Sequence, residues 1–348
     1  MSVQLIQIPS ALGSYPTPGG CEFSEKAVAP DWATNNSPLL TVLGDMHLEN
    51  CRDFPRIVPT AKYLFLAGDI GHISNPVWRS FIEYINGLEP GWHRIFYVLG
   101  NHEYYSNSKT MPVLKKAYQE YLDRYSRIKL LDRNVVYLPE DGCVVLGATM
   151  WSQAEFSLVQ QINDFRRINL KSDPLNPESR TITITPMAMN ELHVADKEWL
   201  FEALSECAIR DDTVDTVVRT QSPATNKVGH APPVLDVTPI LNRALLGSLE
   251  RSSILPTGMD LEFSVNGIST IIILTHFPLV RDGTSHPSYS GQKQAIKNYY
   301  ANDYHQELVL SKKEKQIISI SGHTHFKYDF ELDGIRYINA GACGYHLP

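Results

Sequence analysis

Histidine, aspartate and asparagine side chains occur in this 348-residue sequence directly after short apolar segments, most of them close to a glycine. Imidazole nitrogen and carboxylate oxygen, with no thiolate among them, are ligands that suit divalent ions such as Mn²⁺, Zn²⁺ or Fe²⁺. These side chains therefore predict a metal site assembled from distant parts of the chain. In sequence order they are Asp45, His47, Asp69, Asn101, His102, His276, His323 and His325.

The spacing of two pairs supports a shared site. Asp45 and His47 are two residues apart, as are His323 and His325, so each pair lies on one side of an extended segment. Taken alone, a Gly-Asp such as that ending at Asp69 is usually a turn or a helix cap. The presence of all the groups in order, each at the end of a strand-like segment, favours the functional interpretation.

Short apolar segments bounded by turns precede the candidate ligands, which is typical of strands buried on both faces. Apolar residues at spacings of three and four occur at 78–88 and 111–125, after the second and third of these segments, so the first half of the chain predicts β-α-β-α-β. We expect strands at 39–43, 63–67, 95–99, 135–138, 144–148, 269–274, 317–320 and 335–340, and helices at 78–88, 111–125 and 196–209. We also expect a helix at 156–167 and a loop at 171–186 with a strand at 181–185. The fold class is α/β.

Proline and glycine content divides the chain. Residues 1–38 are expected to be an irregular N-terminal lead-in. Residues 39–348 are expected to form one domain, and 211–267, which contains five prolines, is expected to be an insertion around a short helix at 239–249. The insertion could be a cap over the site or a surface loop.

Composition limits the class of protein. The net charge is −7 and no long basic run occurs, so no strong surface for duplex nucleic acid is expected. The five cysteines are scattered, which argues against a disulfide scaffold or a zinc-thiolate site. Neither a signal peptide nor an apolar run of about 18 residues is seen. We therefore expect a soluble, cytoplasmic protein with no membrane contact.

The candidate ligands occur in five blocks, Asp-x-His, Gly-Asp, Gly-Asn-His-Glu, a single histidine after a strand, and Gly-His-x-His. In this order they resemble the calcineurin-like metallophosphoesterase superfamily. The resemblance covers residues 39–345 and is weak in the insertion. It implies a four-layer α/β/β/α sandwich, with two mixed sheets flanked by helices and the site at the strand ends.

The resemblance also implies a role for each matching residue. Asp45, His47 and His325 would hold one divalent ion, Asn101, His276 and His323 would hold a second, and Asp69 would bridge them. The two ions, Mn, Zn or Fe, would bind a bridging hydroxide that attacks phosphorus, and His102 would protonate the leaving oxygen. The implied protein is a metal-dependent phosphoesterase acting on a small phosphorylated substrate, with a phosphodiester or nucleotide-type substrate slightly preferred.

Position 72 distinguishes branches of this superfamily. Protein serine/threonine phosphatases have a carboxylate there followed by arginine, and purple acid phosphatases have a tyrosine, whereas this chain has His72 and Ile73. Double-strand-break-repair nucleases have histidine there. His72 could contact His102, or it could be a solvated loop residue. The alternatives to a phosphodiesterase are a phosphomonoesterase or protein phosphatase, and a non-catalytic protein-binding scaffold.

Two further features concern the surroundings of the site. Arg166 and Arg167 are candidates for binding a substrate phosphate, because an arginine fork matches its geometry. Segments elsewhere resemble a less studied branch with soluble, single-domain members. These segments are 147–152, 163–165, 276–278 with Tyr289, and 339–345.

Overall fold

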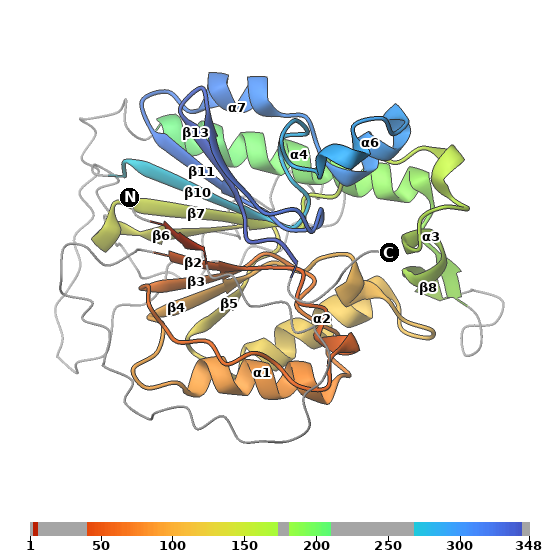
Figure 1. The fold of residues 1–348 in the computed structure, drawn as a ribbon, viewed down its shortest axis with the longest axis horizontal. Helices are drawn as coiled ribbons and strands as arrows, with labels where there is room; N and C mark the ends of the chain where they lie inside the picture. The colour runs from red at the N-terminus through yellow and green to blue at the C-terminus, as the bar shows by residue number, and fades with distance from the viewer. Residues whose placement is uncertain (1–2, 6–39, 173–180, 210–267, 343–348) are drawn as a thin grey trace, which may run out of the picture.

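The computed structural model describes residues 3–5, 40–172, 181–209 and 268–342. Its centre is formed by two β-sheets that face each other (Figure 1). The first sheet has the order β1-β2-β3-β4-β5, and all its strands are parallel. Its strands are β1 (Val3–Leu5), β2 (Leu40–Leu43), β3 (Tyr63–Leu66), β4 (Arg94–Tyr97) and β5 (Ile128–Leu130).

The second sheet is mixed, with the order β12-β13-β11-β10-β7-β6. The inner four strands are parallel, and the edge strands β12 and β6 are antiparallel to their neighbours. Its strands are β6 (Asn134–Leu138), β7 (Cys143–Ala148), β10 (Thr270–Thr275), β11 (Gln316–Ile320), β12 (Tyr328–Leu332) and β13 (Ile335–Asn339). Two mixed sheets were expected, and for the first sheet this is wrong. Its strands are joined by crossovers rather than by hairpins, which makes neighbours parallel.

Helices cover the outer face of each sheet, so the expected four-layer sandwich is confirmed (Figure 1). α1 (Pro76–Gly87) and α2 (Met111–Leu122) lie against the first sheet, and α4 (Pro186–Ile209) and α7 (His305–Ser311) against the second. A buried apolar layer between the sheets includes Val42, Phe65, Val145 and Ile272. Burial on both faces explains why these strands are almost continuously apolar.

The start of α1 follows from local chemistry, whereas the start of the long helix α4 differs from the expectation. The Asn75 Oδ1 atom accepts hydrogen bonds from the backbone N–H groups of Val77 and Trp78, at 2.7 and 3.2 Å, and Pro76 occupies the first helical position of α1. The helix expected at 196–209 begins at Pro186 instead. Met187 and Val194 in its first part are exposed, which blurs the apolar periodicity there.

Shorter elements complete the described part of the chain. The helix expected at 156–167 is split into η4 (Phe156–Leu158) and α3 (Asp164–Arg167). β9 (Thr181–Thr183) confirms the strand expected at 181–185, and it pairs with β8 (Asn169–Ser172), whose last two residues fall in the stretch expected to be a loop. The remaining short helices are η1 (Leu48–Asn50), η2 (His102–Tyr104), η3 (Pro139–Asp141), η5 (Pro287–Tyr289) and α6 (Gln294–Tyr300).

Some expectations fall outside the described residues. The lead-in at 1–38 is described only at Val3–Leu5, which forms an edge strand rather than irregular chain. The insertion at 211–267, with its helix at 239–249, and residues 343–345 are not described. None of the helices in the described ranges has the length and apolar character needed to cross a membrane.

Candidate metal centre

The predicted ligands follow the carboxyl ends of five parallel strands taken from both sheets. Asp45 and His47 follow β2, Asp69 follows β3, and Asn101 and His102 follow β4. From the second sheet, His276 follows β10, and His323 and His325 follow β11. Parallel strands end at the same edge of a sheet, so the crossover topology brings residues more than 270 positions apart into contact.

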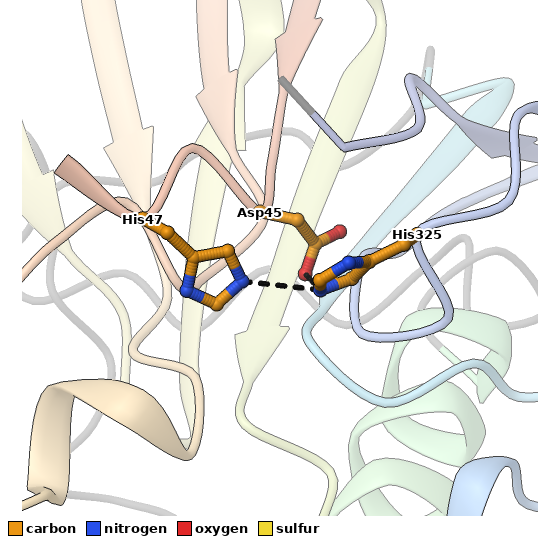
Figure 2. Close-up of side chains that lie close together, drawn as sticks. All are labelled: Asp45, His47 and His325. Carbon is orange, nitrogen blue, oxygen red and sulfur yellow. Dashed lines mark hydrogen bonds and ion pairs between the residues drawn. The ribbon is translucent and has the colours of Figure 1, made fainter. Parts of the chain in front are cut away.

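Asp45, His47 and His325 form a group suited to a cation (Figure 2). The Nε2 atoms of His47 and His325 are 3.1 Å apart, and His325 Nε2 is 3.7 Å from Asp45 Oδ1. Two ring nitrogens approach this closely only if one of them carries a proton that the other accepts. Asp45 Oδ2 and His325 Nδ1 are buried without a hydrogen-bond partner in the described residues. This donor set therefore fits a divalent ion.

A second group surrounds His276. Its Nδ1 atom is 2.9 Å from the Ala67 carbonyl oxygen, and its Nε2 atom is 2.9 Å from Asn101 Oδ1. Both partners are acceptors, so both ring nitrogens donate a proton here. His276 Nε2 is also 3.5 Å from Asp69 Oδ2. A cation that replaced the Nε2 proton would meet the imidazole, the amide oxygen and a carboxylate together.

Asp69 lies between the two groups. Its Oδ2 atom is 3.5 to 4.0 Å from the Nε2 atoms of His276, His47 and His102. Burial raises the pKa of this carboxyl, but the charges of His276 and His102 and a hydrogen bond to His276 hold it well below its usual value. Asp69 is therefore an ionised carboxylate that faces histidine rings from both groups.

Among the predicted ligands, His323 lies outside the Asp/His groups described above. It belongs to none of the three Asp/His groups with ligand atoms within 4.8 Å of one another. Its ring packs against Phe277, with centroids 4.0 Å apart, and lies 5.1 Å from the ring of His276. Burial and the charge of His276 lower its pKa well below the usual value. The ring is therefore neutral. Its Nε2 atom is buried and has no hydrogen-bond partner in the described residues, so this nitrogen could bind a cation.

The backbone beneath these side chains is unusual. In the described residues, nine that are not glycine have positive φ, and five of them are candidate ligands, namely Asp45, His47, Asp69, His323 and His325. This left-handed region is unfavourable for residues with a Cβ atom. Such strain concentrates at functional sites. The neighbouring glycines fit the same close packing, because a Cβ atom at Gly322 would lie 2.7 Å from the Ala67 carbonyl oxygen.

Charge explains the protonation of two histidines. Burial lowers the pKa of His47, but its hydrogen bond to Glu49 and the charges of Asp69 and Asp45 outweigh this and raise it to about 9. Burial likewise lowers the pKa of His276, and Asp69 raises it to about 9. Both rings are therefore cationic at neutral pH in the metal-free protein.

His102 lies at the open side of the cluster, with its side chain 32% exposed. Its ring stacks on Tyr105 with centroids 4.2 Å apart, and its backbone N–H donates to Asp69 Oδ1 at 2.9 Å. His102 Nδ1 is 3.4 Å from Glu49 Oε1. Glu49 was not predicted from the sequence, although its spacing from His47 repeats the spacing of His47 from Asp45.

Two buried carboxylates that were not predicted hold the ligand loops. Glu103 accepts hydrogen bonds from the backbone N–H groups of Asp69, Ile70 and Gly100 at 2.8 to 2.9 Å, and from the Tyr97 hydroxyl at 2.7 Å. It thereby joins the end of β3 to the end of β4. Burial and the charge of Asp69 raise its pKa to about 7.

Asp164 performs a similar task for Asn101. It accepts hydrogen bonds from Asn101 Nδ2 at 2.8 Å and from the hydroxyl groups of Tyr105 and Tyr299, both at 2.6 Å. Because the amide nitrogen is held by Asp164, the amide oxygen of Asn101 faces His276. The segment containing Asp164 was singled out only by its resemblance to one branch of the superfamily, which gave no role for it.

The three remaining predicted residues lie in different places. His72 Nδ1 is 2.6 Å from Ser74 Oγ, and no hydrogen bond joins its ring to His102. The Arg167 guanidinium lies 4.9 Å from the centre of the Tyr105 ring, which itself stacks on His102. Arg166 donates instead to the Gln160 carbonyl oxygen. Only Arg167 is therefore brought close to the cluster.

The family model for calcineurin-like phosphoesterase matches residues 39–236. Uncharacterized protein L509 of Acanthamoeba polyphaga mimivirus is 30% identical over 155 residues, which correspond to 37% of this chain and 51% of the viral protein. The chain thus spans about half the length of this curated relative.

One solved structure adds a likeness in fold. Phosphopantetheinyl hydrolase from Mycobacterium tuberculosis has a TM-score of 0.50 and 13% identity, over 89% of this chain and 90% of that chain. A putative 5′-nucleotidase from Staphylococcus aureus has a TM-score of 0.36 and 13% identity, over 87% of this chain and 48% of that chain. Because the family model matches more than half of the 348 residues, the chain belongs to the calcineurin-like phosphoesterase family, the metal-dependent hydrolases of phosphoester bonds.

Proposed function

We propose that this chain hydrolyses a phosphoester bond with two divalent ions bound at the strand ends. In this proposal one ion is bound by Asp45, His47 and His325, the other by Asn101, His276 and His323, and Asp69 binds both. The main support is two contacts between ligand atoms. His47 Nε2 shares a proton with His325 Nε2, and His276 Nε2 donates a proton to Asn101 Oδ1, so in both places a cation could bind in place of the proton. The donors are all nitrogen and oxygen, which suits Mn²⁺, Zn²⁺ or Fe²⁺.

When bound, two such ions would supply a hydroxide nucleophile at neutral pH and would neutralise charge on the phosphate oxygens. The side chains of this protein contribute orientation. Glu103 holds the backbone N–H groups of Asp69, Ile70 and Gly100, and Asp164 fixes the amide of Asn101. The donors are therefore held in place before substrate binds, which reduces the reorganisation needed during the reaction.

His102 is proposed to act as the acid for the leaving group. Its Nε2 atom faces Asp69 Oδ2 at 4.0 Å, and its side chain is partly exposed, so an ester oxygen can approach it from solvent. Burial lowers its pKa, but the Asp69 charge and the Glu49 hydrogen bond raise it above the usual value. The raised pKa favours the protonated ring, which is the form that can give a proton to a leaving oxygen.

A phosphodiester or small nucleotide-type substrate is proposed ahead of a phosphomonoester. Position 72 lacks the carboxylate of the protein phosphatases, which lowers the weight of that alternative. Arg167 is proposed to contact a phosphate oxygen of the substrate, because its guanidinium lies over the Tyr105 ring, which stacks on His102. Arg166 is left out of this role, since its guanidinium is bound to the chain at Gln160.

The proposal is tested by hydrolysis of bis(p-nitrophenyl) phosphate beside p-nitrophenyl phosphate, with Mn²⁺ added to metal-stripped protein. We expect turnover only after metal is restored, and faster turnover of the diester. Arg167→Ala should raise KM, whereas Arg166→Ala, the neighbouring control, should leave KM unchanged. Absence of turnover on both esters with metal demonstrably bound would favour the scaffold alternative and contradict the proposal.

A further inference from the structure

One carboxylate oxygen lies behind two histidine rings of the site. Glu49 Oε1 is 3.1 Å from His47 Nδ1 and 3.4 Å from His102 Nδ1. The Nε2 atoms on the other side of these rings are 3.9 and 4.0 Å from Asp69 Oδ2. Glu49 is thus placed on the far side of both rings from the carboxylate at the centre of the site.

We propose that Glu49 is a positioning residue for His102, which accepts the hydrogen bond of Nδ1–H and so directs Nε2 toward the leaving oxygen. The inference rests on the proposed function, in which His102 is the acid. The residue that sequence reasoning offered for this contact, His72, does not reach His102 and is hydrogen-bonded to Ser74 instead.

The other contacts of His102 do not perform this task. Its ring stacks on Tyr105 at an interplanar angle of 29° and meets His47 edge to face at 68°, which fixes the plane of the ring. Stacking is equally favourable for either placement of the proton. A carboxylate is an acceptor only, so Glu49 requires the proton to be on Nδ1. Among the described residues, no other side chain is hydrogen-bonded to this nitrogen or paired with it.

The proton balance shows why the tautomer matters. In the proposed step, His102 begins with protons on both nitrogens. When the bond between phosphorus and the leaving oxygen breaks, that oxygen takes the Nε2 proton, and the ring remains neutral with its other proton held by Glu49. A solvent water molecule can reach Nε2, because the side chain is 32% exposed, and gives it a proton. The hydroxide that remains replaces the one consumed in the attack. A ring that kept its last proton on Nε2 could not accept one there.

The test compares Glu49→Gln on two phosphodiesters, one with a poor alkoxide leaving group and one with a 2,4-dinitrophenolate leaving group. We expect kcat to fall about 10- to 100-fold on the poor leaving group, which needs the proton, and to change less than about twofold on the good one. Metal content should be unchanged. Asp53→Asn, an exposed carboxylate in the same loop with no ring contact, removes the same charge and serves as the control.

A double variant separates positioning from a structural effect. In a His102→Asn background, Glu49→Gln should cause no further loss, because Glu49 acts through His102. Three results would overturn the proposal: a further loss of kcat in that background, an equal loss of kcat on both esters, or a fall in metal content. Each would show that Glu49 acts by positioning His47 instead.

Failure of the proposed function would be recognised separately, as a wild-type protein that binds metal and hydrolyses neither ester. The ¹⁵N shifts of His102 in the Zn²⁺-loaded protein then decide the proposal without activity. We expect the neutral ring to be protonated at Nδ1 in the wild type and to shift toward the Nε2 tautomer in Glu49→Gln. An Nε2-protonated ring in the wild type would contradict the proposal.

Discussion

Protons occupy the positions in this site where the proposal places metal ions. His276 donates from Nε2 to Asn101, and His47 shares a proton with His325. The pKa values of His47 and His276 are both raised to about 9, so at pH 7 a metal ion must displace protons from both rings.

This competition gives a pH dependence with a definite sign. Below pH 9 the two rings are protonated in the metal-free protein, so metal affinity should rise with pH, about tenfold per pH unit for each proton displaced, and level off above pH 9. Calorimetry at pH 7 in two buffers with different ionisation enthalpies measures the protons released. Binding of Mn²⁺ without proton release would show that these nitrogens are not the ligands.

Replacement of His102 separates chemistry from metal binding. His102→Asn should keep the metal content of the wild type and lower turnover of a diester with a poor leaving group by about 10²-fold or more. The reason is that the variant retains the ligands but has no proton to give. His93→Asn, an exposed histidine outside the cluster, is the matched control. Unchanged turnover of the poor ester in His102→Asn would exclude His102 as the acid.

At the scale of elements, Glu103 joins the ends of two neighbouring strands. Its carboxylate accepts hydrogen bonds from four backbone N–H groups and a tyrosine hydroxyl, and it is fully buried. In Glu103→Gln the amide NH₂ group would face donors and leave some of them unpaired. We expect the free energy of unfolding to fall by about 3 kcal/mol.

Urea unfolding of the metal-free protein measures this change. The control is Glu120→Gln on α2, an exposed residue whose one ion pair with Lys116 is long, at 3.6 Å. It should change stability by less than about 0.5 kcal/mol. Equal unfolding midpoints for Glu103→Gln and the wild type would show that the loops are held in another way.

Elements with a strong local signal could be predicted from the sequence. The apolar runs before Asp45, Asp69, Asn101 and His276 are buried on both faces, and their strands appear within about two residues of the expected limits. By contrast, β5 and the exposed edge strand β12 were missed. β5 is three residues long, and β12 contains two acidic residues and is largely exposed to solvent. The early start of α4 was missed because its first turns expose apolar side chains.

The site was predictable to a similar degree, for a physical reason. All eight candidates are close to the strand ends that sequence patterns locate, so parallel topology alone brings them to one edge. The residues that orient them could not be found in this way. Asp164 contacts Asn101 from 63 positions away, and the contacts of Glu49 depend on a short helical turn after His47. Such partners depend on tertiary packing, which one sequence does not reveal.

At the scale of the whole molecule, the candidate ligands come from both sheets. Asp45, His47, Asp69 and Asn101 follow strands of the first sheet, and His276, His323 and His325 follow strands of the second. Bound ions would therefore add to the apolar layer and the hydrogen bonds of His276 that already join the two sheets. Metal binding should then stabilise the whole fold rather than one loop.

Thermal unfolding with Mn²⁺ or with EDTA measures this coupling. At a free metal concentration 100 times Kd, each independent site should add about 2.7 kcal/mol of stability and raise Tm by several degrees. The shift should be smaller in His276→Ala, because that variant loses the ligand that β10 provides. Superimposable melting curves with and without metal would contradict a site that spans both sheets.

The most direct test of the account is the number of ions bound and the turnover they support in the wild type and in Asp69→Asn. Native mass spectrometry of Mn²⁺-loaded protein gives the number, and hydrolysis of a chromogenic phosphodiester gives the turnover. We predict two ions per chain in the wild type, and in Asp69→Asn the loss of at least one ion together with turnover. A variant that keeps both ions and wild-type turnover would contradict the proposal that Asp69 bridges a dinuclear centre.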